Sequence, residues 1–177
     1  MSEWAIFLNG TYGVGKSTVL NHVGDLLARA DQPFSLMDVD WYHRSWPPAD
    51  PVLGNSLIEA KNMAASWANY RSVGPRQLVI SGVIRERDEL DRYGSALGLR
   101  IRPVRLVASM ETTERRLQNR YGTRQEWKTE WHLTRLQRLR EKLDESDLDE
   151  AVIDTDDRHP HEVAADVLTH FGYPVKV

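Results

Sequence analysis

The feature that most constrains this chain is a glycine-rich segment that carries a lysine and a serine at fixed spacing, Gly10-Thr11-Tyr12-Gly13-Val14-Gly15-Lys16-Ser17-Thr18. A short apolar run, Trp4–Asn9, precedes this segment, and apolar residues at helical spacing follow it from Ser17 to Ala30. In such a loop successive backbone N–H groups surround a phosphate, and the helix that begins there adds the positive end of its dipole. The segment therefore predicts a phosphate-binding loop between a buried strand and a helix.

Two side chains of this loop have predicted roles in binding a nucleoside triphosphate. In loops of this pattern the lysine, here Lys16, reaches the β- and γ-phosphates. The serine hydroxyl, here Ser17, completes the coordination shell of a Mg²⁺ ion that bridges these phosphates. The alternative is a glycine-rich turn that binds nothing, and the lysine and serine argue against it. The expected ligands are therefore a nucleoside triphosphate, with a lean to ATP, and Mg²⁺.

Five apolar runs alternate with helical patterns along the whole chain. The expected strands are residues 4–9, 34–39, 77–81, 101–107 and 151–154, and the expected helices are 17–30, 56–70, 85–97, 110–120, 125–143 and 161–171. Strands that alternate with helices form a parallel sheet with helices on both faces. No linker-like segment or internal repeat divides the chain. We therefore expect one α/β domain over residues 1–177, with three layers and a five-stranded parallel sheet.

The composition excludes several classes of function. The chain has no cysteine, so disulfides, thiolate metal sites and thiol nucleophiles are all absent. Its 23 basic and 26 acidic residues give a net charge of −3, which makes a nucleic-acid partner an unfavoured interpretation. The apolar runs are too short to cross a bilayer, and residues 1–3 lack the basic start of a signal peptide. We expect a cytoplasmic monomer or homodimer with no membrane partner.

Two acids end the second predicted strand, in the run Met37-Asp38-Val39-Asp40. Alternation along a strand puts Asp38 and Asp40 on the same side, and ligands bind at the carboxyl ends of parallel strands. Beside a magnesium triphosphate, one carboxylate can hold the metal's water shell while the other accepts a proton from an attacking hydroxyl. The third strand ends Val79-Ile80-Ser81-Gly82, without the acid that motor ATPases and GTPases usually place there. A solvated pair of acids in a turn is the alternative.

On these residues the chain resembles the small P-loop kinases of the shikimate kinase and gluconate kinase group, which are related to nucleoside monophosphate kinases and to antibiotic phosphotransferases of the chloramphenicol type. The matching stretches are the loop Gly10–Thr18, the acid pair, and residues 152–160 with the helix that follows them. The resemblance implies a P-loop NTPase fold with a small helical lid at about residues 115–130 and an acceptor-binding region at about 41–72. It also implies transfer of the γ-phosphoryl group of ATP to a hydroxyl.

The resemblance also implies a role for individual residues, by their position. Asp38 would support Mg²⁺, and Asp40 would orient or deprotonate the acceptor hydroxyl. Arg116 and Arg120 would close over the phosphates as lid arginines, and Arg120 would assist the transfer. The other implied nucleotide contacts are Arg158 and Pro160, beside the adenine.

The acceptor side is predicted from the stretch Asp40–Pro48, which follows the acid pair and is rich in aromatic residues. Trp41 offers a flat face to an aromatic, sugar or nucleoside acceptor, but aromatic residues here can equally cap the core beneath an irregular loop. His43 is either an acid–base group or a surface histidine. Shikimate kinases carry three glycines after the third strand, where this chain has Gly82-Val83-Ile84-Arg85. Arg85 is accordingly either an acceptor contact or an exposed residue at a helix start.

Three functions fit these observations. The first is an ATP- and Mg²⁺-dependent kinase whose partner is a small-molecule hydroxyl acceptor. The second is a nucleoside or nucleotide kinase, which predicts acceptors that carry a base. The third is a regulatory ATPase, which binds ATP tightly and turns it over slowly without any acceptor. A kinase that acts on polynucleotide ends is disfavoured by the net acidity and by the lack of a clear basic stripe.

Overall fold

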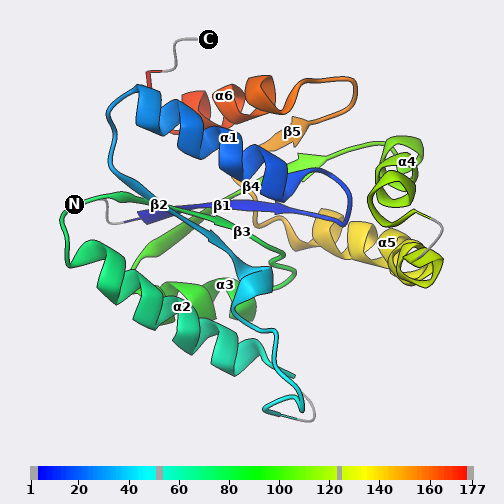
Figure 1. Ribbon diagram of the computed structural model, residues 1–177, viewed down its shortest axis with the longest axis horizontal. Helices are drawn as coiled ribbons and strands as arrows, with labels where there is room; N and C mark the ends of the chain where they lie inside the picture. The colour runs from blue at the N-terminus through cyan, green and yellow to red at the C-terminus, as the bar shows by residue number, and fades with distance from the viewer. Residues whose placement is uncertain (1–3, 51–53, 123–124, 175–177) are drawn as a thin grey trace.

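The computed structural model describes residues 4–50, 54–122 and 125–174. The strands are β1 (Trp4–Gly10), β2 (Phe34–Asp38), β3 (Gln77–Ser81), β4 (Arg100–Val107) and β5 (Val152–Asp154). They form one sheet in the order β2-β3-β1-β4-β5, in which every neighbouring pair is parallel (Figure 1). The predicted five-stranded parallel sheet is therefore confirmed.

Helices cover both faces of this sheet. They are α1 (Lys16–Arg29), the short 3-10 helix η1 (Val39–Trp41), α2 (Ser56–Arg71), α3 (Arg87–Leu97), α4 (Met110–Tyr121), α5 (Glu126–Ser146) and α6 (Pro160–His170). Helices α1 and α6 pack together on one face, and α2 and α3 pack together on the other, so the molecule has the predicted three layers (Figure 1). Helices α4 and α5 pack against each other at the end of the sheet where β1 leads into the glycine-rich loop.

The central strand β1 is buried on both of its faces. Ile6 and Leu8 belong to the core beneath α1 and α6, whereas Ala5 and Phe7 belong to the core beneath α2 and α3. All four side chains are fully buried, and burial of a large apolar side chain stabilises a fold by about 1.5–3 kcal/mol. The loop at the carboxyl end of β1 is therefore carried by one of the most firmly held segments of the molecule.

The boundaries of two helices show how local hydrogen bonds act. Ser109 is the predicted N-cap of α4, and its hydroxyl accepts a hydrogen bond from the backbone N–H of Thr112 at 3.1 Å. Helix α3 begins two residues later than expected, because Glu86 is extended and the backbone N–H of Arg85 donates to the Glu89 carboxylate instead.

Within the described part of the chain, no helix combines the length and the apolar character that a membrane span requires.

Candidate active site

The glycine-rich loop lies between β1 and α1, in the context that the sequence predicts. Gly10 has φ 140°, and a Cβ atom there would lie 2.5 Å from the backbone oxygen of Leu106, so only glycine fits. Gly15 precedes α1 in the left-handed conformation, and no side chain caps the first turn of this helix. The N–H groups of that turn therefore remain suited to an anion, which a helix N-terminus attracts.

Lys16 is the cation of this loop. Its Nζ donates to the backbone oxygens of Gly10 at 2.9 Å and Thr11 at 2.8 Å, so the side chain folds back over the loop. Burial lowers the pKa of Lys16 to about 8, against the opposing effect of the nearby carboxylates of Asp40 and Asp38. A phosphate beside Lys16 would supply a counter-charge for this partly buried ammonium group.

Ser17 and Asp38 form a pair of oxygen ligands beside the loop. The Ser17 hydroxyl donates to the Asp38 carboxylate at 2.6 Å, and the other carboxylate oxygen accepts from the backbone N–H of Asp40 at 3.1 Å. Mg²⁺ is usually bound by one or two protein oxygens together with phosphate oxygens and water. The hydroxyl and carboxylate therefore fit the predicted magnesium ligands in both chemistry and position.

The loop opens into a cavity of about 1210 Å³ that most of the predicted site residues line. On the loop side the lining includes Tyr12, Gly13, Val14, Gly15, Lys16, Ser17, Thr18, Asp38, Arg116, Arg120, Arg158 and Pro160. On the opposite side it includes Asp40, His43, Arg44, Asn55, Ser56, Glu59, Arg85, Glu89, Arg92 and Tyr93. We call these two sides the phosphate half and the acceptor half. The fold thus brings the acid pair, the loop and the predicted arginines to one place.

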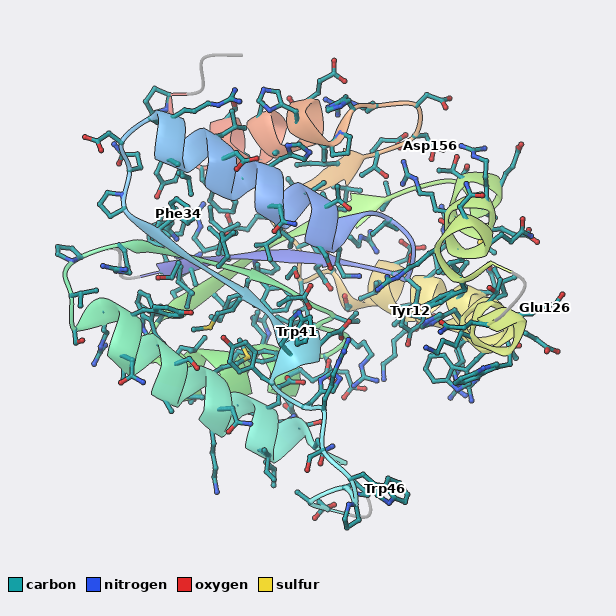
Figure 2. The ribbon with its side chains drawn as sticks, viewed as in Figure 1. Tyr12, Phe34, Trp41, Trp46, Glu126 and Asp156 are labelled. Atoms are coloured by element: carbon teal, nitrogen blue, oxygen red, sulfur yellow. The ribbon has the colours of Figure 1, made fainter. Side chains whose placement is uncertain are left out.

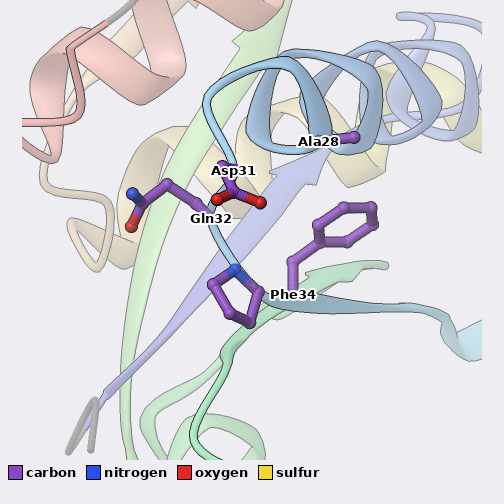
Figure 3. A pocket seen from close by; sticks show the side chains of 5 residues that line it. Ala28, Asp31, Gln32 and Phe34 are labelled. Carbon is purple, nitrogen blue, oxygen red and sulfur yellow. The ribbon is translucent and has the colours of Figure 1, made fainter.

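A second hollow lies at the opposite end of the strands, where β2 begins. It measures about 170 Å³ and sits beside the start of β2 (Figure 3). Its lining residues are Ala28, Asp31, Gln32, Pro33 and Phe34. Because ligands of open α/β sheets bind at the carboxyl ends of the strands, this hollow is not the candidate site.

The predicted arginines differ in what they contact. Arg116 donates to the hydroxyl of Thr155 at 2.9 Å and to its backbone oxygen at 2.7 Å, and it also reaches the backbone oxygen of Val14. This side chain therefore joins α4 to the loop and to the segment after β5, a bracing role that the sequence did not suggest. Arg158 pairs with Asp166 at 2.7 Å. The Arg120 guanidinium lies 5.4 Å from the ring of Tyr121, at the cavity wall.

The stretch after Asp40 lies only partly in the cavity, because His43 and Arg44 line it and the two tryptophans do not. Trp41 is 72% exposed and does not line the cavity, and its ring lies 4.6 Å from the Arg44 guanidinium. Trp46 is 88% exposed, on a loop that extends away from the sheet (Figure 2). Trp41 is therefore not a core residue, and its contact with an acceptor stays a prediction. Arg85 does line the cavity, where its guanidinium is paired with Glu89.

A group of linked side chains in the acceptor half was missed by sequence reasoning. The Nδ1 atom of His43 lies 2.6 Å from the Glu59 carboxylate, and the Tyr93 hydroxyl donates to the other oxygen of that carboxylate. The hydrogen bond to Glu59 raises the pKa of His43, although burial opposes it. The spacing of Glu59, Met63 and Trp67, all buried on α2, was the available signal, because it places an acid on the inner face of a helix.

A cluster of rings joins the loop to α4 and α5. The ring of Tyr12 lies 4.5 Å from His132 and 5.9 Å from Trp131, and the Tyr121 hydroxyl is 2.8 Å from Nε2 of His132. Burial lowers the pKa of His132. These helices occupy the region of the predicted lid, of which residues 123 and 124 lie outside the described residues. Closure of the lid stays a prediction.

Comparison with known proteins shows the fold. No family model matches the chain, and no curated protein matches it in sequence. The structure of a tunicamycin resistance protein from Deinococcus radiodurans matches with a TM-score of 0.69 and 18% identity, over 100% of this chain and 99% of that one. A gluconokinase from Sinorhizobium meliloti matches with a TM-score of 0.61 and 17% identity, over 96% of this chain and 92% of that one. A shikimate kinase from Acinetobacter baumannii, in complex with shikimate, matches with a TM-score of 0.58 and 20% identity, over 97% of this chain and 93% of that one.

The chain has the fold of the P-loop kinases. The resemblance expected from the loop and the acid pair is therefore confirmed at the level of fold, over nearly the whole chain. At sequence identities of 17–20%, these comparisons show the fold alone. The chemistry of the site follows from its own residues.

Proposed function

We propose that this protein transfers the γ-phosphoryl group of ATP, bound with Mg²⁺, to a hydroxyl group of a small molecule. The observation that carries the proposal is that Lys16 and Asp40 line one cavity, with the hydrogen-bonded pair of Ser17 and Asp38 beside them. A cation, a pair of metal ligands and a carboxylate are the parts that phosphoryl transfer to an alcohol requires. Similar folds in proteins named gluconokinase and shikimate kinase support the same class of reaction.

In this proposal each residue of the site has a defined task. The N–H groups at the start of α1 and the Lys16 ammonium hold the phosphates, which positions the γ-phosphorus for in-line attack. Ser17 and Asp38 would hold Mg²⁺, whose charge offsets that of the phosphate oxygens. The Asp40 carboxylate accepts the proton of the acceptor hydroxyl as the new O–P bond forms. The bond between the γ-phosphorus and the bridging oxygen breaks, and ADP leaves.

The acceptor half favours a polar, hydroxyl-rich molecule. Its lining is mostly charged or polar, and the side chains involved are His43, Arg44, Asn55, Ser56, Glu59, Arg85, Glu89 and Arg92. One observation favours a base-bearing acceptor as a second candidate. The aromatic side chains of Tyr121 and Trp131 also line the cavity, and such rings stack on nucleobases.

A screen of acceptors tests this proposal. ADP release is measured with MgATP and a panel of sugars, sugar acids, nucleosides and hydroxylated antibiotics. We expect one class of acceptor to stimulate release, and chelation of Mg²⁺ to abolish the stimulation. Asp40→Asn should lower the stimulated rate by about 10²–10⁴-fold while ATP affinity is retained, because a base is lost and the phosphate contacts are not.

The matched control for this variant is Asp25→Asn, which changes an exposed carboxylate on α1. The control should behave as the wild type in both rate and ATP affinity. Tight binding of ATP without stimulation by any acceptor would contradict the proposal and favour a regulatory ATPase. Stimulation confined to nucleosides would favour the second candidate.

A further inference from the structure

A chain of side-chain contacts crosses the acceptor half and ends at Asp40. Tyr93 of α3 donates to one oxygen of the Glu59 carboxylate, and the other oxygen of Glu59 lies 2.6 Å from Nδ1 of His43. The second ring nitrogen of His43, Nε2, lies 3.9 Å from Oδ1 of Asp40. Three side chains, from two helices and a loop, thus form a chain that ends at the Asp40 carboxylate.

Glu59 determines how the His43 ring is oriented. The residue is only 8% exposed, and a buried carboxylate is costly unless its oxygens have hydrogen-bond partners. Because Glu59 accepts from Nδ1, this nitrogen carries a proton and the ring is held with Nε2 directed toward Asp40. Glu59 therefore holds the His43 ring on the side opposite to Asp40.

The separation of His43 and Asp40 allows one oxygen atom to contact both of them from one side. At 3.9 Å the two atoms are too far apart for a direct hydrogen bond. A hydroxyl oxygen placed about 2.8 Å from each would meet both, with an angle of about 90° between the two hydrogen bonds. Such an oxygen can donate its proton to Asp40 and accept a hydrogen bond from Nε2 at the same time.

We propose that His43 is a second contact of the reacting hydroxyl, with its Nε2–H donating to the oxygen whose own proton is directed at Asp40. The inference rests on the proposed phosphoryl transfer. In the reaction the hydroxyl proton passes to Asp40, and His43 keeps its proton and forms no covalent bond. His43 fixes the direction from which the oxygen attacks, and Glu59 and Tyr93 are positioning residues that act through it.

This role requires the doubly protonated ring, because Nδ1 already donates to Glu59. The charged groups that act on His43 are Glu59 from α2, Asp40 from η1 and the neighbouring Arg44. The two carboxylates raise the pKa of His43 and Arg44 lowers it. The paired Arg85 and Glu89, and also Arg92, line the same cavity from the segment after β3 and from α3.

The experiment uses ATP hydrolysis, in which water is the smallest hydroxyl acceptor and no identified substrate is needed. His43→Asn keeps an amide donor near the position of Nδ1 but removes the nitrogen that faces Asp40. Glu59→Gln removes the carboxylate that holds the ring. His170→Asn, near the end of α6, is the matched control. ADP release is measured for each full-length protein between about pH 5.5 and 9, where a histidine titrates.

We expect His43→Asn to lower kcat for hydrolysis by about tenfold with KM for ATP unchanged, as loss of one oriented contact predicts. The wild-type rate should fall on the alkaline side as His43 loses its proton. This fall should begin at lower pH in Glu59→Gln. In His43→Asn only the fall that Lys16, with its pKa of about 8, imposes on every variant should remain. NMR of the histidine rings should give the same displacement for the pKa of His43. The control should match the wild type.

Other outcomes separate this inference from the proposed function. If Asp40→Asn slows hydrolysis and His43→Asn does not, the contact is wrong and the phosphotransferase proposal stands. If His43→Asn lowers the melting temperature but leaves kcat and the pH profile unchanged, the chain of contacts is only structural and the inference is overturned. Binding of MgATP without any hydrolysis would overturn it too, because water fits the same position. If ATP does not bind at all, the proposed function itself fails.

Discussion

The phosphate half and the acceptor half of the cavity are built in different ways. Seven consecutive residues, 12–18, which include the start of α1, supply most of the phosphate half. The acceptor half is assembled from η1, the loop after it, α2, and α3 with the segment before it, whose residues are up to about 50 positions apart. One half therefore depends on a continuous segment of backbone, and the other depends on how separate elements pack.

The acceptors of the hydrogen bonds also differ between the two halves. In the phosphate half, Lys16 and Arg116 donate chiefly to backbone oxygens, which the fold itself places. In the acceptor half, His43 and Arg85 are held by carboxylate side chains. Substitutions in the phosphate half should therefore affect every reaction that uses ATP, whereas substitutions in the acceptor half should change which hydroxyl reacts. This difference suits a fold whose nucleotide site stays constant while its acceptors vary.

The largest effect should come from Lys16→Ala. It removes the cation of the loop, and we expect the rate of ATP turnover to fall by on the order of 10³-fold, with much weaker binding of MgATP. Calorimetry with MgATP and the ADP-release assay measure the two effects. The control, Lys61→Ala, removes an exposed lysine of α2 and should change neither. Normal binding of MgATP by Lys16→Ala would show that the loop is not the phosphate site.

An intermediate effect should separate Arg116 from Arg120. Arg116→Ala removes three hydrogen bonds that brace the loop, and should lower the free energy of unfolding without nucleotide by about 1–3 kcal/mol. Arg120→Ala, at an exposed position, should change stability by no more than about 0.5 kcal/mol but lower kcat by about 10–100-fold. Urea unfolding measures the change in stability, and ADP release measures the change in kcat. The reverse pattern would make Arg116 the lid arginine and Arg120 a structural residue.

The sequence predicted the phosphate half because its determinants are contiguous. A strand, a loop of fixed spacing and a helix are read from neighbouring residues, and the acid pair follows the next strand at once. The bracing role of Arg116 was not predictable, since its partners Thr155 and Val14 come from segments about 40 and 100 residues away. Fully buried Asn9 is a similar case, because its side chain ties β1 to Ile84 and Asp149.

The acceptor half could not be predicted in the same way. Glu59 lies on a helix, and its position relative to His43 depends on the path of the intervening loop, which no local pattern specifies. The aromatic residues of that loop drew attention because they are unusual, whereas the side chains that line the cavity are His43 and the buried acid Glu59. Large apolar side chains are often exposed in soluble proteins, so an aromatic stretch is weaker evidence for a site than a buried charge.

The smallest effect should therefore come from Trp41, which the sequence made the candidate for contact with an acceptor. Trp41→Ala removes a ring that is 72% exposed and contacts Arg44. An exposed cation–π contact contributes about 0.5–1 kcal/mol, so we expect a modest loss of stability and a change in turnover within about twofold. Trp67→Ala is the contrasting variant, because this tryptophan is 5% exposed and should cost about 3–5 kcal/mol. A KM for the acceptor raised more than about fivefold by Trp41→Ala, with KM for ATP unchanged, would show that the loop folds over the acceptor once it binds.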